Sequence, residues 1–354
     1  MKQLKKNDKV AIVSLSFGIL GEPFVSHELQ LGKKRLEEMG LVPVFMPNSL
    51  KGIEFLKQHP EARAEDLKTA FKDPEIKMIL CAIGGFDTHR TIPYLLGDKE
   101  FVETVKNNPK IFIGYSDSTT NHLTLYKLGL KTFYGMALLT DFAEFENEML
   151  PYTKSAFLRF FEPKIPYLIE SSPVWYADRT DFSPAAVGTN RVRKNEIRGY
   201  EVLQGTKKVT GKLLGGCFDV LTHLAFPTDE EEIEIKNKFD VFPTLDEWNG
   251  KILFTEPSDS KMEPEKFREN IKKFKKFGLF NRISGMIFGK PIDEVFYDEY
   301  KTILKEELSE FDFPIIINLN FGHAYPHTII PYGEECELDP KNKTITILTS
   351  SLEK

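Results

Sequence analysis

The first half of the chain alternates short apolar runs with longer helical stretches, and this alternation constrains the fold more than any other feature. Four apolar runs, at 10–13, 42–45, 78–83 and 111–113, have the length and β-branched content of buried strands. Helical stretches follow them near 26–39, 64–71, 88–96 and 118–128. This order predicts an α/β fold in which a doubly wound, mainly parallel sheet is covered by helices on both faces.

The second half of the chain has a different pattern. From 163 to 198 prolines recur without a sustained period, which is typical of a linker or a long substrate loop. Strand-like runs follow at 201–203, 251–254, 285–288 and 315–317, with a helical stretch at 263–277 and a hairpin candidate in "CELDPKNKTITIL". We therefore expect an N-terminal α/β domain at 1–162, the linker or loop at 163–198, and a C-terminal mixed α/β domain at 199–354.

Charge and cysteine content exclude several classes of function. The net charge is −6 and no dense block of lysine and arginine occurs, so we expect neither nucleic acid nor a membrane surface as a partner. A basic N-terminus precedes the apolar run "VAIVSLSFGIL", but no small-residue cleavage site follows it, so we interpret this run as a first strand. The three cysteines are widely spaced and near no histidine pair, which indicates no disulfide framework, no metal site and a cytoplasmic location.

Ser116 lies between the apolar run at 111–113 and the helical stretch at 118–128, within "IGYSDSTTNHL". A serine at a strand-to-helix turn has an exposed hydroxyl group, and the next backbone N–H groups point outward from the helix N-terminus. Such a turn can supply a nucleophile and half of an oxyanion hole. The alternative is that Ser116 or Ser118 only caps the helix, and the segment retains just the first glycine of the G-x-S-x-G motif.

A second strand-to-helix turn carries the glycine pair of "CAIGGFDTHR". In a doubly wound sheet such turns converge at one edge, so the backbone N–H of Gly85 could donate to an oxyanion beside the N–H of Asp117. Gly84 would let the backbone approach a bound substrate closely. The alternative is a pair needed only for a tight turn. A dinucleotide-binding fingerprint is disfavoured because the G-x-G-x-x-G spacing is absent.

A serine nucleophile requires a base and an orienting carboxylate. His323 follows the apolar run "FPIIINLN" in the loop "FGHAYPH", at a predicted strand end, and His327 is a rival in the same loop. Glu256 follows another apolar run in "KILFTEPSDS", with Asp259 as the nearest competitor. Spacing alone does not select between these carboxylates.

Five segments in order resemble one known family. They are "GGFDTHRTIPYL", "IGYSDSTTNHLTLYKLGLKTFYG", "GYEVLQGTKKVTGKLLGGCFDVL", "ILFTEPSD" and "NLNFGHAYPHTIIPYG". The chain is similar along nearly its whole length to the serine peptidase family of LD-carboxypeptidases and microcin C immunity proteins. The resemblance implies that Ser116 is the nucleophile, with Glu256 and His323 completing a triad. It also implies an active site between the two domains, no metal or other cofactor, and a homodimer.

The resemblance also implies two substrate classes. LD-carboxypeptidases remove the terminal D-alanine from a murein tetrapeptide, whereas the microcin branch cleaves the bond joining a peptidyl or aminoacyl carboxyl group to a nucleotide-like group. The segment containing Trp175 resembles the second branch, in which such a tryptophan stacks on the nucleobase; ordinary packing of Trp175 is the alternative. Arg179, Arg191 and Arg193 are candidate anion-binding residues in the same segment, or solvated surface charges.

We therefore predict a serine peptidase or amidase that acts on a peptidyl- or aminoacyl-nucleotide, with murein carboxypeptidase activity as the alternative. Met136 stands where many family members have proline, and Pro257 and Ser258 replace a more polar pair after Glu256. These departures leave the substrate preference open. A prediction from another class is a non-catalytic, two-lobed protein that binds a peptide or nucleotide, although none of the three triad residues is missing.

Overall fold

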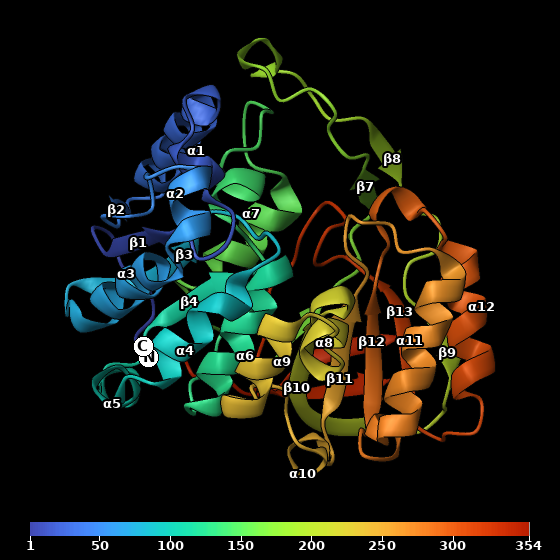
Figure 1. Ribbon diagram of the computed structural model, residues 1–354. Helices are drawn as coiled ribbons and strands as arrows, with labels where there is room; N and C mark the ends of the chain where they lie inside the picture. The colour runs from blue at the N-terminus through green and yellow to red at the C-terminus, as the bar shows by residue number, and fades with distance from the viewer. Residues whose placement is uncertain (354) are drawn as a thin grey trace.

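The computed structural model describes residues 1–353, which form two sheets that lie side by side, each covered by helices (Figure 1). The first sheet has the spatial order β14 (Ile330–Pro331), β5 (Phe133–Tyr134), β4 (Ile111–Gly114), β3 (Ile76–Cys81), β1 (Lys9–Val13) and β2 (Val42–Phe45). Strands β1 to β5 are parallel, and β14 pairs antiparallel with β5 at one edge.

Helices cover both faces of the first sheet, as the sequence predicts. They are α1 (Ser26–Glu38), α2 (Ile53–Gln58), α3 (Pro60–Lys72), α4 (Ile92–Leu96), α5 (Lys99–Asn107), α6 (Thr119–Lys127) and α7 (Pro151–Leu158). Ile12 of β1 packs in one apolar cluster with Leu36 of α1, whereas its neighbour Ala11 packs in another with Phe71 of α3. Because successive strand residues point to opposite faces, these two clusters lie on opposite sides of the sheet.

The second sheet has eight strands. In spatial order they are β6 (Tyr167–Ile169), β16 (Thr344–Ile347), β15 (Glu335–Asp339), β10 (Val209–Cys217), β11 (Ile252–Glu256), β12 (Gly285–Gly289), β13 (Ile315–Leu319) and β9 (Glu201–Gln204). The central strands β10 to β13 are parallel, β15 and β9 pair antiparallel with the two outer strands of this group, and β16 and β6 continue the antiparallel pairing beyond β15. The associated helices are α8 (Phe218–Ala225), α9 (Glu230–Lys238), α10 (Leu245–Trp248), α11 (Pro264–Phe277) and α12 (Tyr297–Leu308).

The predicted α/β fold with a mixed second sheet is therefore confirmed, but the central strand β10 was missed. Its segment "VTGKLLGGC" contains three glycines, which lower the strand signal. Gly215 is required there by packing, since an added Cβ would lie 1.7 Å from the carbonyl oxygen of Phe254 on β11.

Strand pairing crosses the predicted domain boundaries twice. Strand β6 lies within the segment 163–198 but belongs to the second sheet, and β14 comes from the C-terminal half but extends the first sheet. The two chain ends lie together, with Lys2 bridged to Glu353 (Figure 1). The division at 162 and 198 stays a prediction. The two strand pairings show that the halves on either side of it also contact each other.

The rest of the segment 163–198 forms an arm. Strands β7 (Val174–Tyr176) and β8 (Arg193–Asn195) pair with each other, and the chain between them extends beyond both sheets at the top of Figure 1. Within the described residues, no helix is long and apolar enough to cross a bilayer.

Candidate active site

Ser116 lies at the carboxyl end of β4, where a short 3₁₀ turn, η4 (Ser116–Ser118), leads into α6. Its φ angle is 60°, in the left-handed region that side chains other than glycine rarely adopt. Backbone strain of this kind is common at functional residues and costs about 1–2 kcal/mol. The sharp turn presents the hydroxyl group to the cavity described below rather than to the helix, so the capping alternative does not describe its contacts.

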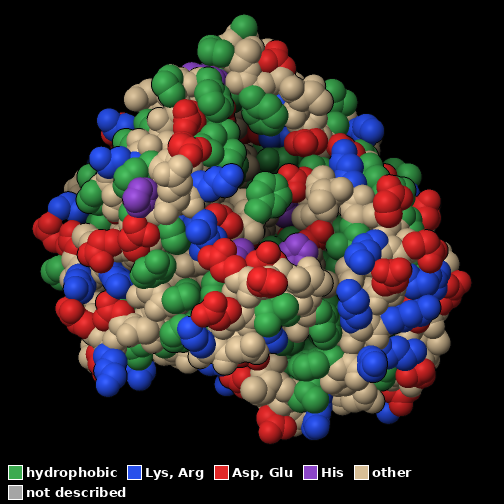
Figure 2. All heavy atoms as spheres, in the orientation of Figure 1, with side chains coloured by type: hydrophobic (Ala, Val, Ile, Leu, Met, Phe, Trp, Pro, Cys, Tyr) green, Lys and Arg blue, Asp and Glu red, His purple; other side chains and the backbone are tan. Residues whose placement is uncertain are grey.

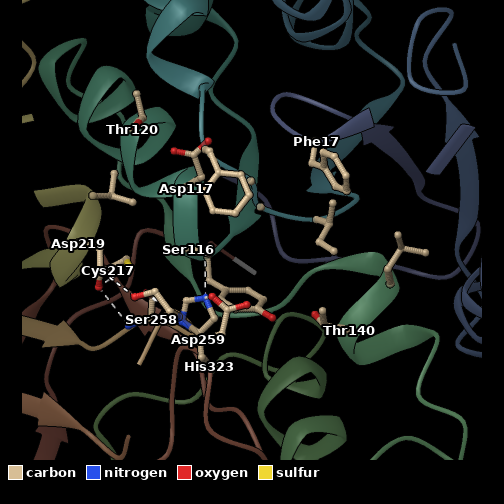
Figure 3. A pocket seen from close by; sticks show the side chains of 18 of the residues that line it. Phe17, Ser116, Asp117, Thr120, Thr140, Cys217, Asp219, Ser258, Asp259 and His323 are labelled. Atoms are coloured by element: carbon tan, nitrogen blue, oxygen red, sulfur yellow. Dashed lines mark hydrogen bonds and ion pairs between the residues drawn. The ribbon is translucent and has the colours of Figure 1, made fainter. Parts of the chain in front are cut away.

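The structure joins Ser116, His323 and Glu256 through two hydrogen bonds, as Figure 3 shows for the first pair. Nε2 of His323 lies 3.0 Å from Oγ of Ser116, and Nδ1 of the same ring lies 2.8 Å from Oε2 of Glu256. The serine comes from the first sheet, whereas the glutamate ends β11 and the histidine follows β13 in the second. A serine, a base and an orienting carboxylate in this arrangement can carry out nucleophilic acyl transfer.

Burial and charge act in opposite directions on His323. Burial disfavours the protonated imidazole, but the charge and hydrogen bond of Glu256, with smaller contributions from the charges of Asp259 and Asp219, outweigh burial and raise the pKa of His323 to about 9. The Glu256 side chain is fully buried. Gly322, next to the histidine, has a φ of 77°, and an added Cβ there would lie 2.2 Å from Cδ of Glu256. The loop can therefore approach the carboxylate only with glycine at this position.

Tyr134 of β5 links the nucleophile turn to the carboxylate. Its hydroxyl group donates to Oε1 of Glu256 at 2.7 Å and accepts the backbone N–H of Ser116 at 3.0 Å. Burial, together with the charge of Glu256, raises the pKa of Tyr134 well above its usual range, so the hydroxyl stays a donor. Tyr134 could not be predicted as a site residue from the sequence, because a tyrosine in a short apolar run is typical of the hydrophobic core.

Two glycines bring the loop after β3 against the serine turn. An added Cβ on Gly84 would lie 2.8 Å from Cβ of Ser116 and 3.3 Å from the backbone nitrogen of Asp117. Gly85 has a φ of 154°, and an added Cβ there would lie 2.2 Å from Oγ of Ser16. The N–H of Asp117 lies in the first turn of a helix, where no intrahelical acceptor precedes it. The loop that contains Gly85 therefore lies against the serine turn that contains the N–H of Asp117.

The side-chain carboxylate of Asp117, unlike its backbone N–H, has a structural role, because it links neighbouring loops. It accepts hydrogen bonds from the hydroxyl of Ser16 and from both the backbone N–H and the hydroxyl of Thr88, at 2.9 and 2.7 Å for the latter two. These contacts tie the loops that follow β1, β3 and β4 at the point where the strand order of the sheet reverses, which is where α/β sheets bind ligands.

The rival residues do not take the positions of His323 and Glu256. Nδ1 of His327 contacts Asp141 at 2.7 Å, and no hydrogen bond joins its ring to Ser116. The carboxylate of Asp259 is 3.8 Å from Nε2 of His323, and its side chain is 69% exposed. Glu256 instead accepts a hydrogen bond from the other ring nitrogen, Nδ1. A further histidine, His122 of α6, is buried, and its two ring nitrogens contact the hydroxyl group of Thr132 and the carbonyl oxygen of Gly114.

A cavity of about 750 Å³ opens at Ser116 between the two sheets. Figure 2 shows this face hollowed near its middle, with histidine, acidic and hydrophobic side chains around the hollow. In Figure 3, Cys217, Asp219 and Ser258 lie on one side of Ser116, and Phe17 and Thr140 lie on the other. Gly84, Gly85 and Asp117 also line the cavity.

The structure does not bring Trp175 to the cavity. Its side chain is 6% exposed and packs with the ammonium groups of Lys194 and Lys290, at 4.5 and 5.3 Å from the ring. Met136 is fully buried in the core of the first sheet and does not line the cavity, whereas Ser258 does. The base-stacking role predicted for Trp175 therefore has no support in the position of the ring.

Arg179 and Arg191 line the cavity, but both are ion-paired with Glu144. Their side chains are 8% and 4% exposed, so neither is a solvated surface charge. The third candidate, Arg193, lies on the exposed strand β8 and is not among the cavity residues. Lys236, the remaining basic side chain there besides histidines, pairs with Asp240 at 2.9 Å. No lysine or arginine that lines the cavity is thus left without an acidic partner in the described residues.

Cys217 lies beside His323 and Glu256. This proximity could not be predicted from the sequence. Potential ligand atoms of the three residues lie within 4.8 Å of one another. Burial raises the pKa of the Cys217 thiol well above its usual range, and the charges of Glu256 and Asp219 add to this shift. Metal binding requires the thiolate, and the other two side chains already bind each other, so this set fits a metal ion poorly.

Comparison with known families gives two matches that together span most of the chain. The LD-carboxypeptidase N-terminal domain matches residues 10–135, and the LD-carboxypeptidase C-terminal domain matches residues 210–338. Ser116 falls within the first match, and Glu256 and His323 fall within the second.

Three individual proteins illustrate the similarity. A crystal structure of an MccF-like protein from Streptococcus pneumoniae in complex with AMP is 45% identical, covering 96% of this chain and 98% of that one, with a TM-score of 0.91. The microcin self-immunity protein MccF of Escherichia coli is 28% identical, over 80% of this chain and 77% of its own length. A protein of Bacillus subtilis named "Probable murein peptide carboxypeptidase" is 26% identical, over 98% and 93%.

Proposed function

This chain belongs to the LD-carboxypeptidase family and is a serine peptidase, and we propose that it hydrolyses the bond joining a peptidyl or aminoacyl carboxyl group to a nucleotide-like group. The observation that carries this proposal is the hydrogen-bonded set of Ser116, His323 and Glu256, of which Ser116 and His323 line a cavity of about 750 Å³.

In the proposed mechanism, Oγ of Ser116 attacks the carbonyl carbon while Nε2 of His323 takes the hydroxyl proton. Glu256 orients the imidazole and stabilises its protonated form. The N–H groups of Gly85 and Asp117 donate to the oxyanion of the tetrahedral intermediate. The imidazolium then returns the proton to the leaving group, which departs and leaves an acyl ester on Ser116. Water, deprotonated by His323, attacks the ester, and release of the carboxylic acid regenerates the serine.

Three observations support a nucleotide-like leaving group. The relative that is 45% identical was crystallised with AMP, and its chain is covered almost completely by this one. The cavity is large enough for an aminoacyl nucleotide, since ligand pockets for molecules of this size are typically about 300–1,000 Å³. Phe145 and Phe182 line the cavity with their ring centroids 6.3 Å apart, and such rings can contact a base.

The alternative function is removal of the terminal residue from a murein tetrapeptide, which the Bacillus subtilis relative supports. A carboxypeptidase must bind the free carboxylate of its substrate, for which proteins use arginine or lysine. In the cavity of this chain Arg179 and Arg191 already share Glu144, which makes them poor partners for a second carboxylate. This pairing counts against recognition of a free substrate carboxylate by these two arginines.

A hydrolysis assay with two substrates in parallel tests the proposal. Aspartyl sulfamoyl adenosine and a murein L,D-tetrapeptide are offered to the wild type and to Ser116→Ala, and products are measured by mass spectrometry. Cleavage of the adenosine conjugate alone, abolished in Ser116→Ala, is the expected result. Release of D-alanine instead would assign the chain to the murein branch, and binding without hydrolysis of either would identify a non-catalytic binding protein.

Homodimer formation and a cytoplasmic location are further parts of this proposal. Several hydrophobic side chains are exposed, among them Phe86 at 89% and Ile197 at 86%. Exposed side chains of this kind can be covered by a second copy of the chain. Light scattering coupled to size-exclusion chromatography tests the oligomeric state, and a monomeric mass at micromolar concentration would contradict it.

A further inference from the structure

Glu28 is a buried carboxyl group without a partner. It lies in the first turn of α1, lines the cavity, and is 7% exposed. No hydrogen bond to its carboxylate occurs among the described residues, and the nearest basic atom is Nε2 of His27 at 3.9 Å, which is engaged with the carbonyl oxygen of Phe182 at 3.0 Å. A buried carboxylate normally has hydrogen-bond donors, because losing water without replacement is costly.

Glu28 is the residue of α1 that lines the cavity, and the helix face that carries it is held in place by packing. Gly32 and Arg35 are four and seven residues further along α1 and lie on the same face. An added Cβ on Gly32 would lie 2.9 Å from Leu138, and Arg35 donates to the carbonyl oxygen of Phe142 at 3.0 Å. The face therefore packs on the segment 138–146, which carries Thr140, and Figure 3 shows Thr140 on the side of Ser116 opposite to Asp219.

Two aromatic residues contact His27, the residue next to Glu28. The ring of His27 lies 5.5 Å from that of Phe145, and the same histidine bonds the backbone of Phe182. Phe145 and Phe182 line the cavity together with Glu28. A ligand part that fits here must offer an apolar or aromatic surface to the rings and hydrogen-bond donors to the carboxylate.

We propose that Glu28 accepts hydrogen bonds from the vicinal hydroxyl groups of the ribose in a nucleoside-containing substrate, with the base against Phe145 and Phe182. This inference rests on the proposed function. The two oxygens of a carboxylate match the two adjacent donors of a ribose diol. An adenine edge fits less well, since its amino donor lies beside ring nitrogens that are acceptors, and a phosphate group would be repelled. In nucleotide-binding folds, acidic side chains recognise ribose hydroxyl groups in this way.

Binding measurements with altered ligands and altered protein test this contact. Isothermal titration calorimetry compares AMP, 2′-deoxy-AMP and 3′-deoxy-AMP binding to the wild type, Glu28→Gln and Glu28→Leu, with Glu38→Gln, at the far end of the same helix, as the matched control. The wild type should bind each deoxy ligand about tenfold or more weakly than AMP, as expected for losing a hydrogen bond to a charged group. Glu28→Leu should bind AMP as weakly as the deoxy ligands and no longer distinguish them, Glu28→Gln should be intermediate, and Glu38→Gln should behave as the wild type.

A folding control separates a lost contact from a lost fold. Burial raises the pKa of Glu28 to about 7, so the ionised carboxylate destabilises the free protein at higher pH. Both Glu28 variants should therefore melt no lower than the wild type at pH 8. A clearly lower melting temperature for Glu28→Gln would mean that the carboxyl group has a structural role, and this would overturn the inference.

Other outcomes also decide the inference. Equal affinity of the wild type for AMP and its deoxy forms, or an unchanged ratio in Glu28→Leu, would overturn it. A Glu28-dependent preference for AMP over inosine monophosphate would place the carboxyl group at the base instead. If AMP does not bind the wild type, the inference fails as well. The hydrolysis assay then reports independently, since cleavage of aspartyl sulfamoyl adenosine would leave the proposed function standing.

Discussion

The hydroxyl group of Tyr134 donates to Oε1 of Glu256 at 2.7 Å, and this contact joins a strand of the first sheet to the carboxylate of the second. Because the same hydroxyl accepts the N–H of Ser116, one side chain positions both ends of the proposed triad. Strands β5 and β11 belong to different sheets, so the contact also fixes the distance between the two halves of the site.

We expect Tyr134→Phe to lower kcat with little change in KM, because the ring still packs but two buried polar groups lose their partner. The same loss should cost about 1–3 kcal/mol in the free energy of unfolding. Steady-state kinetics and urea unfolding measure both effects. Tyr152→Phe, which removes a hydroxyl bonded to the carbonyl oxygen of Glu170, is the control and should leave kcat unchanged. An unaltered kcat in Tyr134→Phe would contradict the positioning role.

Replacement of Ser116 should separate activity from strain. Both Ser116→Ala and Ser116→Gly should lose at least about 10⁴-fold in kcat, as expected when a nucleophile is removed. Since the φ angle of 60° favours glycine, Ser116→Gly should be more stable than Ser116→Ala by about 1 kcal/mol in urea unfolding. Equal stability of the two variants would mean that the backbone at this turn is not strained in solution.

The pH dependence of the reaction should report on His323. Its pKa of about 9 keeps the imidazole largely protonated at neutral pH, whereas a general base must be neutral. We expect kcat/KM to rise about tenfold per pH unit toward pH 9 and then to level off. Glu256→Gln should move the inflection to lower pH and lower the plateau by about 10²–10⁴-fold, since it removes the charge that raises the pKa. An inflection unchanged in Glu256→Gln would exclude this coupling.

The same group should contribute to stability in a pH-dependent way. The pKa of His323 is higher in the folded protein, at about 9, than its ordinary value of 6.5. Its stabilising contribution is therefore fully present below pH 6.5 and is lost as the pH rises through about 9. The difference in unfolding free energy between the wild type and His323→Gln should shrink between pH 6 and pH 10. A constant difference across this range would show that the pKa is not raised.

Two glycines with similar backbone angles provide a matched test of the loop at Glu256. Gly322 has a φ of 77° and would place a Cβ 2.2 Å from Cδ of Glu256, whereas Gly129 has a φ of 86° and open space around it. Gly129→Ala should cost only the conformational strain, about 1–2 kcal/mol, with unchanged kcat. Gly322→Ala should cost more and lower kcat, because Glu256 or the loop must move. Equal effects of the two substitutions on stability and activity would contradict this account.

Much of the first sheet could be predicted from the sequence, because buried parallel strands are continuous apolar runs separated by helical stretches. Strand β10 could not, since Gly211, Gly215 and Gly216 weaken its local signal while serving close contacts with neighbouring chain segments. The short strand β14 has too few residues to produce a pattern, and its partner β5 is distant in the sequence.

The candidate site was predictable in part for the same reason. Ser116, Glu256 and His323 each follow an apolar run, and this local feature identifies a strand end. No local sequence pattern indicates that the carboxyl group of Glu28 has no hydrogen-bond partner, or that Tyr134 contacts both Ser116 and Glu256. Trp175 shows the converse case, in which a residue that resembles a base-stacking tryptophan lies against two lysine side chains away from the cavity.

The sequence by itself determined the α/β order of elements, the serine at a strand-to-helix turn and the glycines beside it, because these depend on neighbours along the chain. Only the tertiary structure decided that His323, 207 positions from Ser116, reaches its hydroxyl group, while His327 does not. It also decided that Glu256, rather than Asp259, forms the hydrogen bond to Nδ1 of the His323 imidazole. Hydrogen bonds require distances near 3 Å and correct angles. Those distances are set by how the two sheets are placed side by side, which residue spacing does not encode.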